Sequence, residues 1–416
     1  MIDRFDILFL GKMFPKDDEY LIRKKARVDM QDAANVLQWN IIDGILANMT
    51  EGSMLIESYY PIDSWPRHYR GAFIKRHTYM ISKNCTFDTI PFCNITYIKQ
   101  ILSSMACCHA VMPWAKRKSP NHKIIFCYTS NNAFMKAIKK AKKKDPSIKV
   151  VQLIADLIEF AVNNDATCIQ KMYNSWQVKQ NNRLRRYIDG YILLTEQMRD
   201  KLNITKPYIV MEGIAAKRDS IIFSITRDND VKTILYTGSM NTKYGILELL
   251  EAFSKIGMSN YRLVLCGVGN DESIISIIKE YCKRDSRIVF LGKVPHDEVL
   301  DLQANSTVLV NPRRNNEEFT KYSFPSKNLE YLSSGTPLVA YKLDGIPDEY
   351  DDYIYYVPDN DPVTLAKRLI EVCEMPEEQR KAMGLKAREF VNNNKNPKIQ
   401  TKRILDFIKA ELIGNA

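Results

Sequence analysis

The sequence lacks several patterns that would define other classes of protein. No apolar stretch approaches the roughly 18–20 residues needed to span a bilayer, and the nearest, residues 101–115, is interrupted by His109 and other polar residues. Residues 1–12 hold one short apolar run with charges on both sides, so we expect a first strand there and not a signal peptide. Short repeats and low-complexity segments are missing too.

Cysteine and histidine are too scattered for a metal or disulfide framework. The nine cysteines are odd in number, and the adjacent Cys107 and Cys108 suit neither a bridge nor a tetrahedral zinc site. We therefore expect reduced thiols in a cytoplasmic protein. None of the five histidines pairs with a serine or cysteine in a recognisable nucleophile arrangement. The sequence thus predicts no metal site and no catalytic nucleophile.

The net charge of +11 lies almost wholly in the first half of the chain. Residues 1–212 hold 32 Lys/Arg against 20 Asp/Glu, whereas the remainder holds 28 against 29. Solvated helix faces would explain this excess. So would attraction to an anionic membrane surface, where each basic residue contributes about 1 kcal/mol. Nucleic acid is not expected as a partner, because no binding motif accompanies the charge.

Both halves alternate short apolar strands with helical patterns. In the first half we expect a helix at residues 32–46 and strands at 6–10, 53–57, 123–128, 149–154, 190–195 and 207–211. The alternation repeats from residue 232, with strands at 234–239, 261–267, 288–292 and 307–310 and final helices at 376–394 and 397–412. Such alternation favours parallel sheets, whose ligands bind at the carboxyl ends of the strands.

The segment from Thr307 to Pro347 has the pattern of one nucleotide-binding unit. A strand ends in Asn-Pro-Arg-Arg, a polar loop follows, and a helix is expected to begin at Pro325 and Ser326. Free peptide N–H groups at such a start can hold a phosphate. Glu330, about one turn further on, can accept two hydrogen bonds from a ribose diol.

Two cations, Arg313 and Lys327, stand at the ends of the polar loop, where a diphosphate would need its charge offset. A lysine in the first turn of a helix opposes the helix dipole. Its presence suggests that an anion arrives between the ammonium group and the peptide N–H groups. The alternative is a plain exposed lysine.

The segments on both sides of residues 307–347 extend the pattern. Upstream, a strand leaves at Gly238 and a helix opens at residues 244–250; downstream, residues 338–347 and 357–362 complete the order. This half resembles the donor-binding domain of glycosyltransferase family 4, retaining enzymes of the GT-B type. The resemblance covers residues 232–416 in detail and the first half more loosely. It implies two Rossmann-like doubly wound domains facing a central cleft, with a C-terminal helix that crosses back to the first domain.

The resemblance implies roles for single residues. The chain first differs from the family pattern at the position that would contact the donor sugar. The family's two glutamates are separated by seven residues. The second matches Glu330, with Phe324 in the expected aromatic place. Tyr322 stands where the first glutamate would approach the donor sugar. The chain is therefore a variant that lacks this first glutamate, and a neutral phenol changes which sugar is held.

The second departure lies in the loop from Gly238 to Gly245. Ser239 and Tyr244 replace the arginine and lysine that the family usually carries there, and Lys243 is the candidate substitute. If the basic pair is lost, the cations after residue 312 become the better diphosphate ligands: Arg313, Arg314, Lys321 and Lys327. The nucleotide base is expected on backbone groups near Val294.

The first half contributes two further candidates. Gly11 lies in the first strand-to-helix turn, where family members carry glycines that approach the diphosphate. Asp156 follows the strand at 149–154, where the family has a polar residue on the acceptor side. It would either position the attacking hydroxyl or cap a buried helix.

These patterns together predict four parts. They are a basic acceptor-binding domain at residues 1–212, a linker at 213–230, a nucleotide-sugar domain at 231–395 and a helix at 396–416 that packs on the first domain. Aromatic and apolar residues of the first domain would face the acceptor or a membrane: Trp65, Phe73, Tyr79, Phe92 and Trp114.

The predicted function is metal-independent, retaining transfer of a sugar from a nucleotide diphosphate to a glycan or polyprenyl-linked acceptor, in cell-surface polysaccharide synthesis. No cofactor is expected beyond the nucleotide sugar. The expected location is the cytoplasm, either free or at the inner face of the membrane. Two alternatives remain open: a non-catalytic sugar-nucleotide-binding protein, and a GT-B nucleotide-sugar epimerase.

Overall fold

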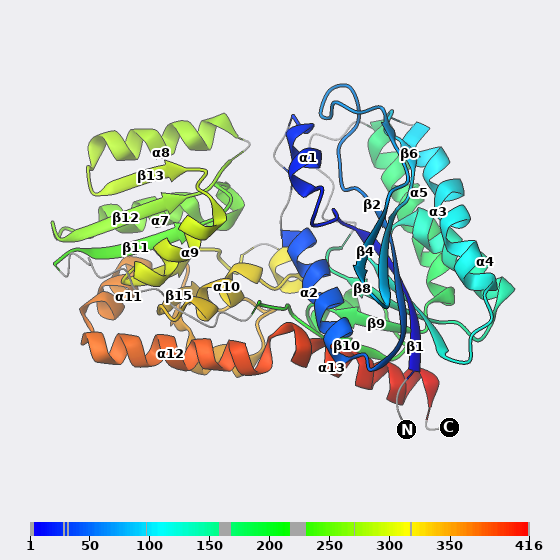
Figure 1. Cartoon of the computed structure of the whole chain (residues 1–416). Helices are drawn as coiled ribbons and strands as arrows, with labels where there is room; N and C mark the ends of the chain where they lie inside the picture. The colour runs from blue at the N-terminus through cyan, green and yellow to red at the C-terminus, as the bar shows by residue number, and fades with distance from the viewer. Residues whose placement is uncertain are drawn as a thin grey trace. The chain divides into compact units, whose positions relative to one another are not determined.

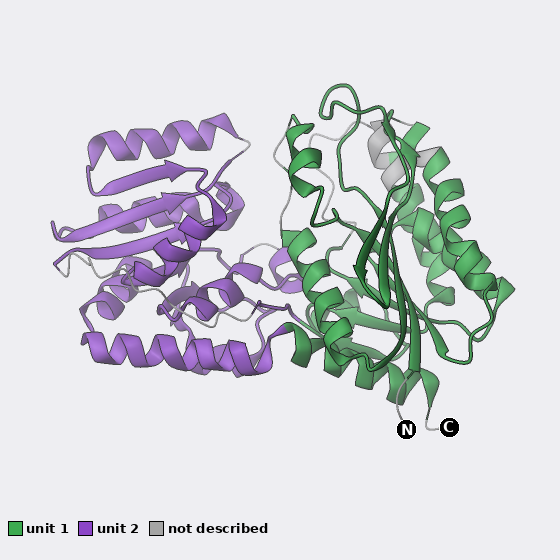
Figure 2. Ribbon diagram, viewed as in Figure 1, with its two compact units in different colours: residues 1–211, 397–416 green, residues 212–396 purple. Residues whose placement is uncertain are grey.

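The computed structural model describes residues 4–27, 30, 33–96, 98–157, 168–216, 230–269, 271–316 and 318–414. The chain divides into two compact units, residues 1–211 with 397–416 and residues 212–396 (Figure 2). Each unit has a mostly parallel sheet with helices on both faces, as Figure 1 shows. The prediction of an α/β fold with two Rossmann-like sheets is therefore confirmed.

The first unit is built on an eight-stranded sheet in the order β10-β9-β8-β7-β1-β2-β5-β4. All neighbouring pairs are parallel except β4 and β5. The strands are β1 (Arg4–Lys12), β2 (Glu51–Tyr59), β4 (Thr78–Ser82), β5 (Cys85–Thr89), β7 (His122–Tyr128), β8 (Lys149–Ile154), β9 (Gly190–Leu193) and β10 (Tyr208–Val210). A separate two-stranded ribbon pairs β3 (Phe73–Ile74) with β6 (Phe92–Cys93).

Helices cover both faces of this sheet. The helices of the unit are α1 (Glu19–Lys24), α2 (Ala33–Asn48), α3 (Ile98–Lys116), α4 (Asn132–Lys144), α5 (Cys168–Leu184), α6 (Gln197–Lys201) and α13 (Pro397–Phe407), with a 3₁₀ turn at Arg185–Tyr187 and a π-helical end at Ile408–Ile413. On one face Phe134 of α4 stacks on Tyr59, with ring centroids 5.6 Å apart. On the other, Trp39 of α2 stacks on Phe87 at 5.9 Å.

The C-terminal helix α13 packs closely against α2. A Cβ atom on Gly44 would lie 2.3 Å from the Pro397 carbonyl oxygen, so only glycine permits this approach. The Asn48 amide donates to the Lys398 carbonyl at 2.8 Å and to the Thr401 hydroxyl at 3.0 Å. The last helix thus belongs to the first unit, although the chain reaches it from the second.

The second unit has a six-stranded, fully parallel sheet in the order β13-β12-β11-β14-β15-β16. Its strands are β11 (Lys232–Thr237), β12 (Tyr261–Cys266), β13 (Ile288–Gly292), β14 (Val308–Asn311), β15 (Leu338–Tyr341) and β16 (Tyr355–Val357). Its helices are α7 (Ile246–Ser254), α8 (Glu272–Arg284), α9 (His296–Asn305), α10 (Ser326–Ser334), α11 (Pro362–Glu374) and α12 (Glu377–Asn394), with 3₁₀ turns at Thr242–Tyr244, Glu318–Tyr322 and Asp348–Tyr353.

The residues expected to form a linker divide into two groups. Residues 213–216 and residue 230 lie in the second unit, where the Ala215 N–H donates to the Lys395 carbonyl at 3.0 Å. The Lys395 ammonium is buried, 2.5 Å from the Glu212 carboxylate. The chain therefore enters and leaves this unit at one ionic contact. Residues 217–229 lie outside the described part of the chain.

In the first unit, one pair of strands was not predicted and one expectation is wrong. The strands β4 and β5 form an antiparallel hairpin at the sheet edge that the alternation of strands and helices did not predict. Phe92 and Trp114 were expected to face an acceptor or a membrane, but their side chains are 5% and 7% exposed. They pack in the core, whereas Trp65 and Phe73 are exposed.

Candidate nucleotide site

The candidate site lies where the strand order of the second sheet changes direction, between β11 and β14. Connections from these neighbouring strands run to opposite sides. In open α/β sheets, the crevice outside the carboxyl ends of the strands at such a point is where ligands bind. The loops here approach so closely that they require glycine. A Cβ on Gly267 would lie 1.8 Å from the Gly238 carbonyl oxygen, and one on Gly245 would lie 1.9 Å from the Pro312 carbonyl oxygen.

Lys327, in the first turn of α10, extends over Gly238 at the end of β11. A Cβ atom built on Gly238 would lie 1.3 Å from the Lys327 Nζ, so the ammonium group occupies the space that a side chain would fill. The ammonium donates to the Tyr236 hydroxyl at 3.2 Å. Burial lowers the pKa of Lys327 to about 8; nearby Arg313 adds to this effect and Glu330 opposes it.

Arg313, two residues after the end of β14, is the second cation of the crevice. Its side chain is buried, its Nη2 donates to the Ser323 hydroxyl at 2.6 Å, and its guanidinium carbon lies 4.6 Å from the Phe319 ring centroid. The Tyr244 ring lies near both Arg313 and Lys327, at 5.8 Å from each charge. The two cations therefore share one aromatic neighbour at the crevice.

Glu330 is held from behind by a fully buried glutamine. The Gln303 amide of α9 donates to the Glu330 carboxylate and, at 3.2 Å, to the Thr237 hydroxyl. The Tyr331 hydroxyl in turn accepts from the Thr237 N–H at 2.8 Å and donates to its carbonyl at 3.0 Å. This network fixes the Glu330 carboxylate relative to the end of β11.

The helix α10 begins as expected, with Pro325 before it and Ser326 as its first, exposed residue. No side chain caps the helix start. The arrangement therefore combines three features: a helix N-terminus, two cations and a carboxylate. It can offset the charge of a diphosphate and accept hydrogen bonds from a diol.

Other predicted residues lie around this centre with different exposures. Phe324 is buried against Tyr350, with ring centroids 5.3 Å apart, so it supports the loop from the core and presents no ring to a ligand. Tyr322 is half-buried at the end of a 3₁₀ turn. Lys243 is exposed, and Val294 is half-buried in the loop after β13.

Arg314 and Lys321 are not placed like Arg313. The Arg314 guanidinium forms an ion pair at 2.5 Å with Glu248 of α7, so its charge is already compensated within the fold. Lys321 is exposed on the 3₁₀ turn before Tyr322. Of the four cations predicted here, the structure brings Arg313 and Lys327 together.

In the first unit, Gly11 lies buried under α2. A Cβ there would be 3.1 Å from the Gln38 Oε1, and that amide group also pairs with the backbone N–H and carbonyl of Lys12, at 2.8 Å each. Gln38 therefore occupies the space beside Gly11 in which the resemblance expects a diphosphate.

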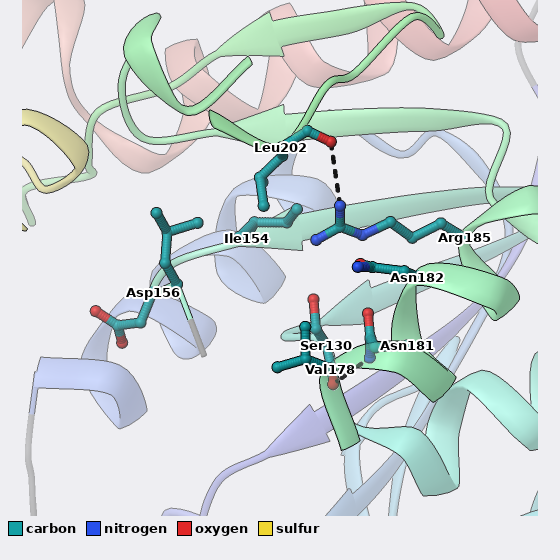
Figure 3. Close-up of a pocket in the computed structure, with 9 residues that line it drawn as sticks. Ser130, Ile154, Asp156, Val178, Asn181, Asn182, Arg185 and Leu202 are labelled. Atoms are coloured by element: carbon teal, nitrogen blue, oxygen red, sulfur yellow. Dashed lines mark hydrogen bonds between the residues drawn. The ribbon is translucent and has the colours of Figure 1, made fainter. Parts of the chain in front are cut away.

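Asp156 lies at the rim of a small pocket at the carboxyl ends of β7 and β8 (Figure 3). The residue is exposed, so the alternative of a buried cap is wrong. In Figure 3 its carboxylate points away from the Arg185 guanidinium, whose Nη1 donates to the Leu202 carbonyl at 3.2 Å. The pocket is lined by Ser130, Ile154, Asp156, Leu157, Val178, Asn181, Asn182, Arg185 and Leu202.

Sequence reasoning missed the residues that hold the site in place. Gln303 and Tyr236 touch Glu330 and Lys327, respectively, from elements distant in the sequence. Neither stands in a motif, and the complete burial of Gln303, which Gln38, Gln152 and Gln400 share, is not a signal that the sequence gives.

The described residues hold neither a metal-type cluster nor a membrane-spanning helix. No three His, Cys, Asp or Glu side chains in the described ranges gather as a metal site would require. Within the same ranges, no helix is both long enough and apolar enough to cross a bilayer.

Comparison with known proteins agrees with this geometry. Residues 217–390 match the family described as Glycosyl transferases group 1. A putative colanic acid biosynthesis glycosyltransferase, WcaL of Escherichia coli (strain K12), is 22% identical over 181 residues. That match covers 42% of this chain and 45% of the relative's length.

Solved structures resemble almost the whole chain. Sucrose-phosphate synthase from Thermosynechococcus elongatus superposes with a TM-score of 0.67 at 15% identity, covering 97% of this chain and 98% of that one. An α,α-trehalose-phosphate synthase (UDP-forming) from Burkholderia xenovorans, in complex with glucose-6-phosphate, gives 0.65 at 11%, covering 98% and 100%. Anabaena HepE in complex with UDP gives 0.63 at 11%, covering 97% and 99%.

The chain has the GT-B fold of these solved structures over almost its whole length. The part that matches the Glycosyl transferases group 1 model, residues 217–390, contains Lys327, Arg313 and Glu330.

Proposed function

We propose that the protein transfers a sugar from a nucleotide-diphosphate donor to a glycan or lipid-linked acceptor. The observation that carries this proposal is the position of Lys327, whose ammonium fills the space over Gly238 beside Arg313 and the start of α10. A diphosphate bound there would meet two cations and a helix N-terminus. Glu330, held by Gln303, would accept the ribose hydroxyls.

The chemistry follows from the leaving group. Transfer breaks the bond between the sugar and an anionic diphosphate, so stabilising the developing charge and positioning the acceptor supply most of the rate. In this proposal Lys327 and Arg313 stabilise the leaving diphosphate. The leaving phosphate takes the acceptor proton, the reaction retains configuration, and no metal is needed. Asp156, exposed at the carboxyl edge of the first sheet, would orient the acceptor hydroxyl.

The acceptor belongs to cell-surface polysaccharide synthesis in this proposal. Support comes from the named role of the E. coli relative and from the basic charge of the first 212 residues. Exposed Trp65 and Phe73 in that unit would contribute apolar contacts to an acceptor or to an anionic membrane at the cytoplasmic face. Family 4 membership, with Tyr322 in place of the first glutamate, is part of the same proposal.

A binding panel tests the donor site. Nucleoside diphosphates and their sugars would be screened by thermal shift against the wild type, Glu330→Ala and the control Glu389→Ala, which removes an exposed glutamate of α12. We expect one nucleotide class to stabilise the wild type and the control, by about 2.7 kcal/mol at 100 times the dissociation constant. Glu330→Ala should bind more weakly. Equal responses from all three proteins would contradict the assignment.

A further inference from the structure

The pocket in Figure 3 is lined by both apolar and hydrogen-bonding side chains, all from the first unit. The apolar ones are Ile154, Leu157, Val178 and Leu202. The polar ones include Ser130, just after β7, and Asn181 and Asn182, near the end of α5. A ligand that matches this lining must itself have an apolar face and a hydrogen-bonding edge.

Asn181 presents a buried oxygen to this pocket. The residue is 1% exposed, and its Nδ2 donates to the Ser130 carbonyl at 2.6 Å and to the Asn132 Oδ1 at 3.4 Å. These two bonds fix the orientation of the amide, and in Figure 3 its Oδ1 points toward Asn182 and Arg185. Among the residues that the structure describes, this oxygen has no hydrogen-bond donor. Buried polar atoms are rarely left unpaired, so we expect the donor to come from a ligand.

The Ser130 hydroxyl is the second polar group, and the fully buried Gln152 orients it. The Gln152 Nε2 donates to the Ser130 Oγ and to the Thr129 carbonyl, each at 3.3 Å. Because the Ser130 oxygen accepts this bond, its own hydrogen remains to be donated. Thr129 has a φ of +71°, a strained conformation for a β-branched residue and one that is found at functional sites. This strained turn places the Ser130 donor next to the Asn181 acceptor.

A donor and an acceptor side by side match a hydroxyl group, which makes both kinds of hydrogen bond. A phosphate or carboxylate fits poorly, because the Asn181 oxygen would face its negative charge and the Asp156 carboxylate lies at the rim. A single water molecule would satisfy Asn181 but would not cover the apolar side chains. A pyranose ring does both, since its hydroxyls project from the edge and its C–H groups form apolar faces.

We propose that this pocket binds one uncharged sugar ring of the acceptor. A ring hydroxyl donates to the Asn181 Oδ1 and accepts from the Ser130 hydroxyl, and the ring packs on the apolar side chains. This inference rests on the proposed function and names the part of the acceptor that the first unit recognises. Asp156, whose carboxylate points away from Arg185, then faces a hydroxyl that stays outside the pocket.

Saturation-transfer NMR with methyl glycosides tests the proposal in the whole protein. The probes are the methyl pyranosides of glucose, galactose and mannose, with methyl glucuronide as the charged comparison. We expect at least one neutral glycoside to bind, and to bind more tightly than the glucuronide. Ser130→Ala should raise its dissociation constant about fivefold, and Asn181→Leu by at least as much, as the loss of one hydrogen bond implies.

Ser104→Ala is the matched control, because it removes a half-buried serine hydroxyl from α3, outside the pocket. This variant should bind the glycoside as the wild type does. If Asn181→Leu disturbs the packing of α5, judged by circular dichroism, Ser130→Ala alone carries the test. The proposal is overturned if no neutral glycoside binds the wild type, if only the glucuronide binds, or if Ser130→Ala binds with unchanged affinity.

The panel of nucleoside diphosphates separates this proposal from the proposed function. Ser130→Ala should keep the nucleotide response of the wild type, because the crevice with Lys327 lies in the second unit. If the wild type binds a glycoside through Ser130 but responds to no nucleotide, the proposed function fails and the sugar pocket stands. If the nucleotide response is intact and no glycoside binds, the sugar pocket alone fails.

Discussion

At the scale of the residue, burial alters the protonation of ionisable side chains in both units. Lys327 and Glu57 are the clearest examples, because burial is the largest cause of the pKa change in both. The two groups change in the direction that favours the neutral form. Each therefore makes a property of the protein depend on pH near neutrality.

Donor binding should weaken as the pH rises above about 8. The pKa of Lys327 is lowered to about 8, and an anionic diphosphate binds the protonated ammonium. Its contribution is thus complete below pH 8 and lost above it, by up to about tenfold per pH unit for a single proton. Calorimetric titrations of a nucleoside diphosphate between pH 7 and 9.5 check this. A flat profile in the wild type, or the same slope in Lys327→Gln, would contradict it.

Glu57 should make folding stability fall as the pH rises. Its carboxylate is fully buried on β2 beside Asp88 of β5, and Arg76 lies 2.8 Å away. Burial raises the pKa of Glu57 from 4.5 to about 7, Asp88 adds to this effect and Arg76 opposes it. The native state therefore holds this proton more tightly than the unfolded chain does. Stability is lost as pH rises from about 4.5 through 7.

The variant Glu57→Gln tests this effect. The wild type should lose on the order of 2–3 kcal/mol more than Glu57→Gln between pH 5 and 8, measured by urea unfolding. Glu389→Gln, which changes an exposed carboxylate of α12, should follow the wild type. Parallel profiles of unfolding free energy against pH for Glu57→Gln and the wild type would contradict the raised pKa of Glu57.

At the scale of the element, the site forms where the loop after β11 packs against the loop after β14. Gly238 has φ of +141°, and the Lys327 ammonium lies where its side chain would be. Gly238→Ala should therefore displace the ammonium and strain the backbone. We expect a loss of about 1–2 kcal/mol in unfolding free energy and a loss of nucleotide binding larger than that of Glu330→Ala.

Gly257→Ala is the control for that variant. Gly257 lies in the same unit, with open space around the added methyl group. It should keep both stability and nucleotide binding. Nucleotide binding that is retained in Gly238→Ala would show that the position of Lys327 over this glycine is not needed for the ligand.

Most of the strands, and the start of α10, could be predicted from the sequence. Hydrophobic alternation predicted the strands from β7 to β9 and from β11 to β15, and Pro325 with Ser326 predicted the start of α10. The hairpin of β4 and β5 was missed because its pairing depends on the sheet edge, which a local pattern does not record. The burial of Phe324 and the support of Glu330 by Gln303 likewise depend on contacts between distant elements.

At the scale of the whole molecule, the chain crosses between its units twice, and both crossings meet in the second unit at Lys395. Its ammonium lies 2.5 Å from the Glu212 carboxylate and 2.6 Å from the Glu349 carboxylate. The Tyr350 hydroxyl donates to Glu212 at 2.6 Å. These contacts tie the entering segment to the departing one.

Removing only the Lys395 charge should lower the unfolding free energy more than removing the charges of both Lys395 and Glu212. Lys395→Met leaves the Glu212 carboxylate buried without its cation, which should lower the unfolding free energy by about 3–5 kcal/mol. Adding Glu212→Gln should restore part of that loss, since no buried charge is left uncompensated at that position. Urea unfolding of the wild type, both single variants and the double variant measures the coupling. Strict additivity would contradict a direct interaction.

The most direct test of the central claim is a crystal structure with a nucleoside diphosphate bound. We expect β-phosphate oxygens about 2.7–2.9 Å from the Lys327 ammonium, at the start of α10, with the ribose hydroxyls on Glu330. A nucleotide bound elsewhere, or a diphosphate that contacts Lys243 and leaves Lys327 on the Tyr236 hydroxyl, would contradict it.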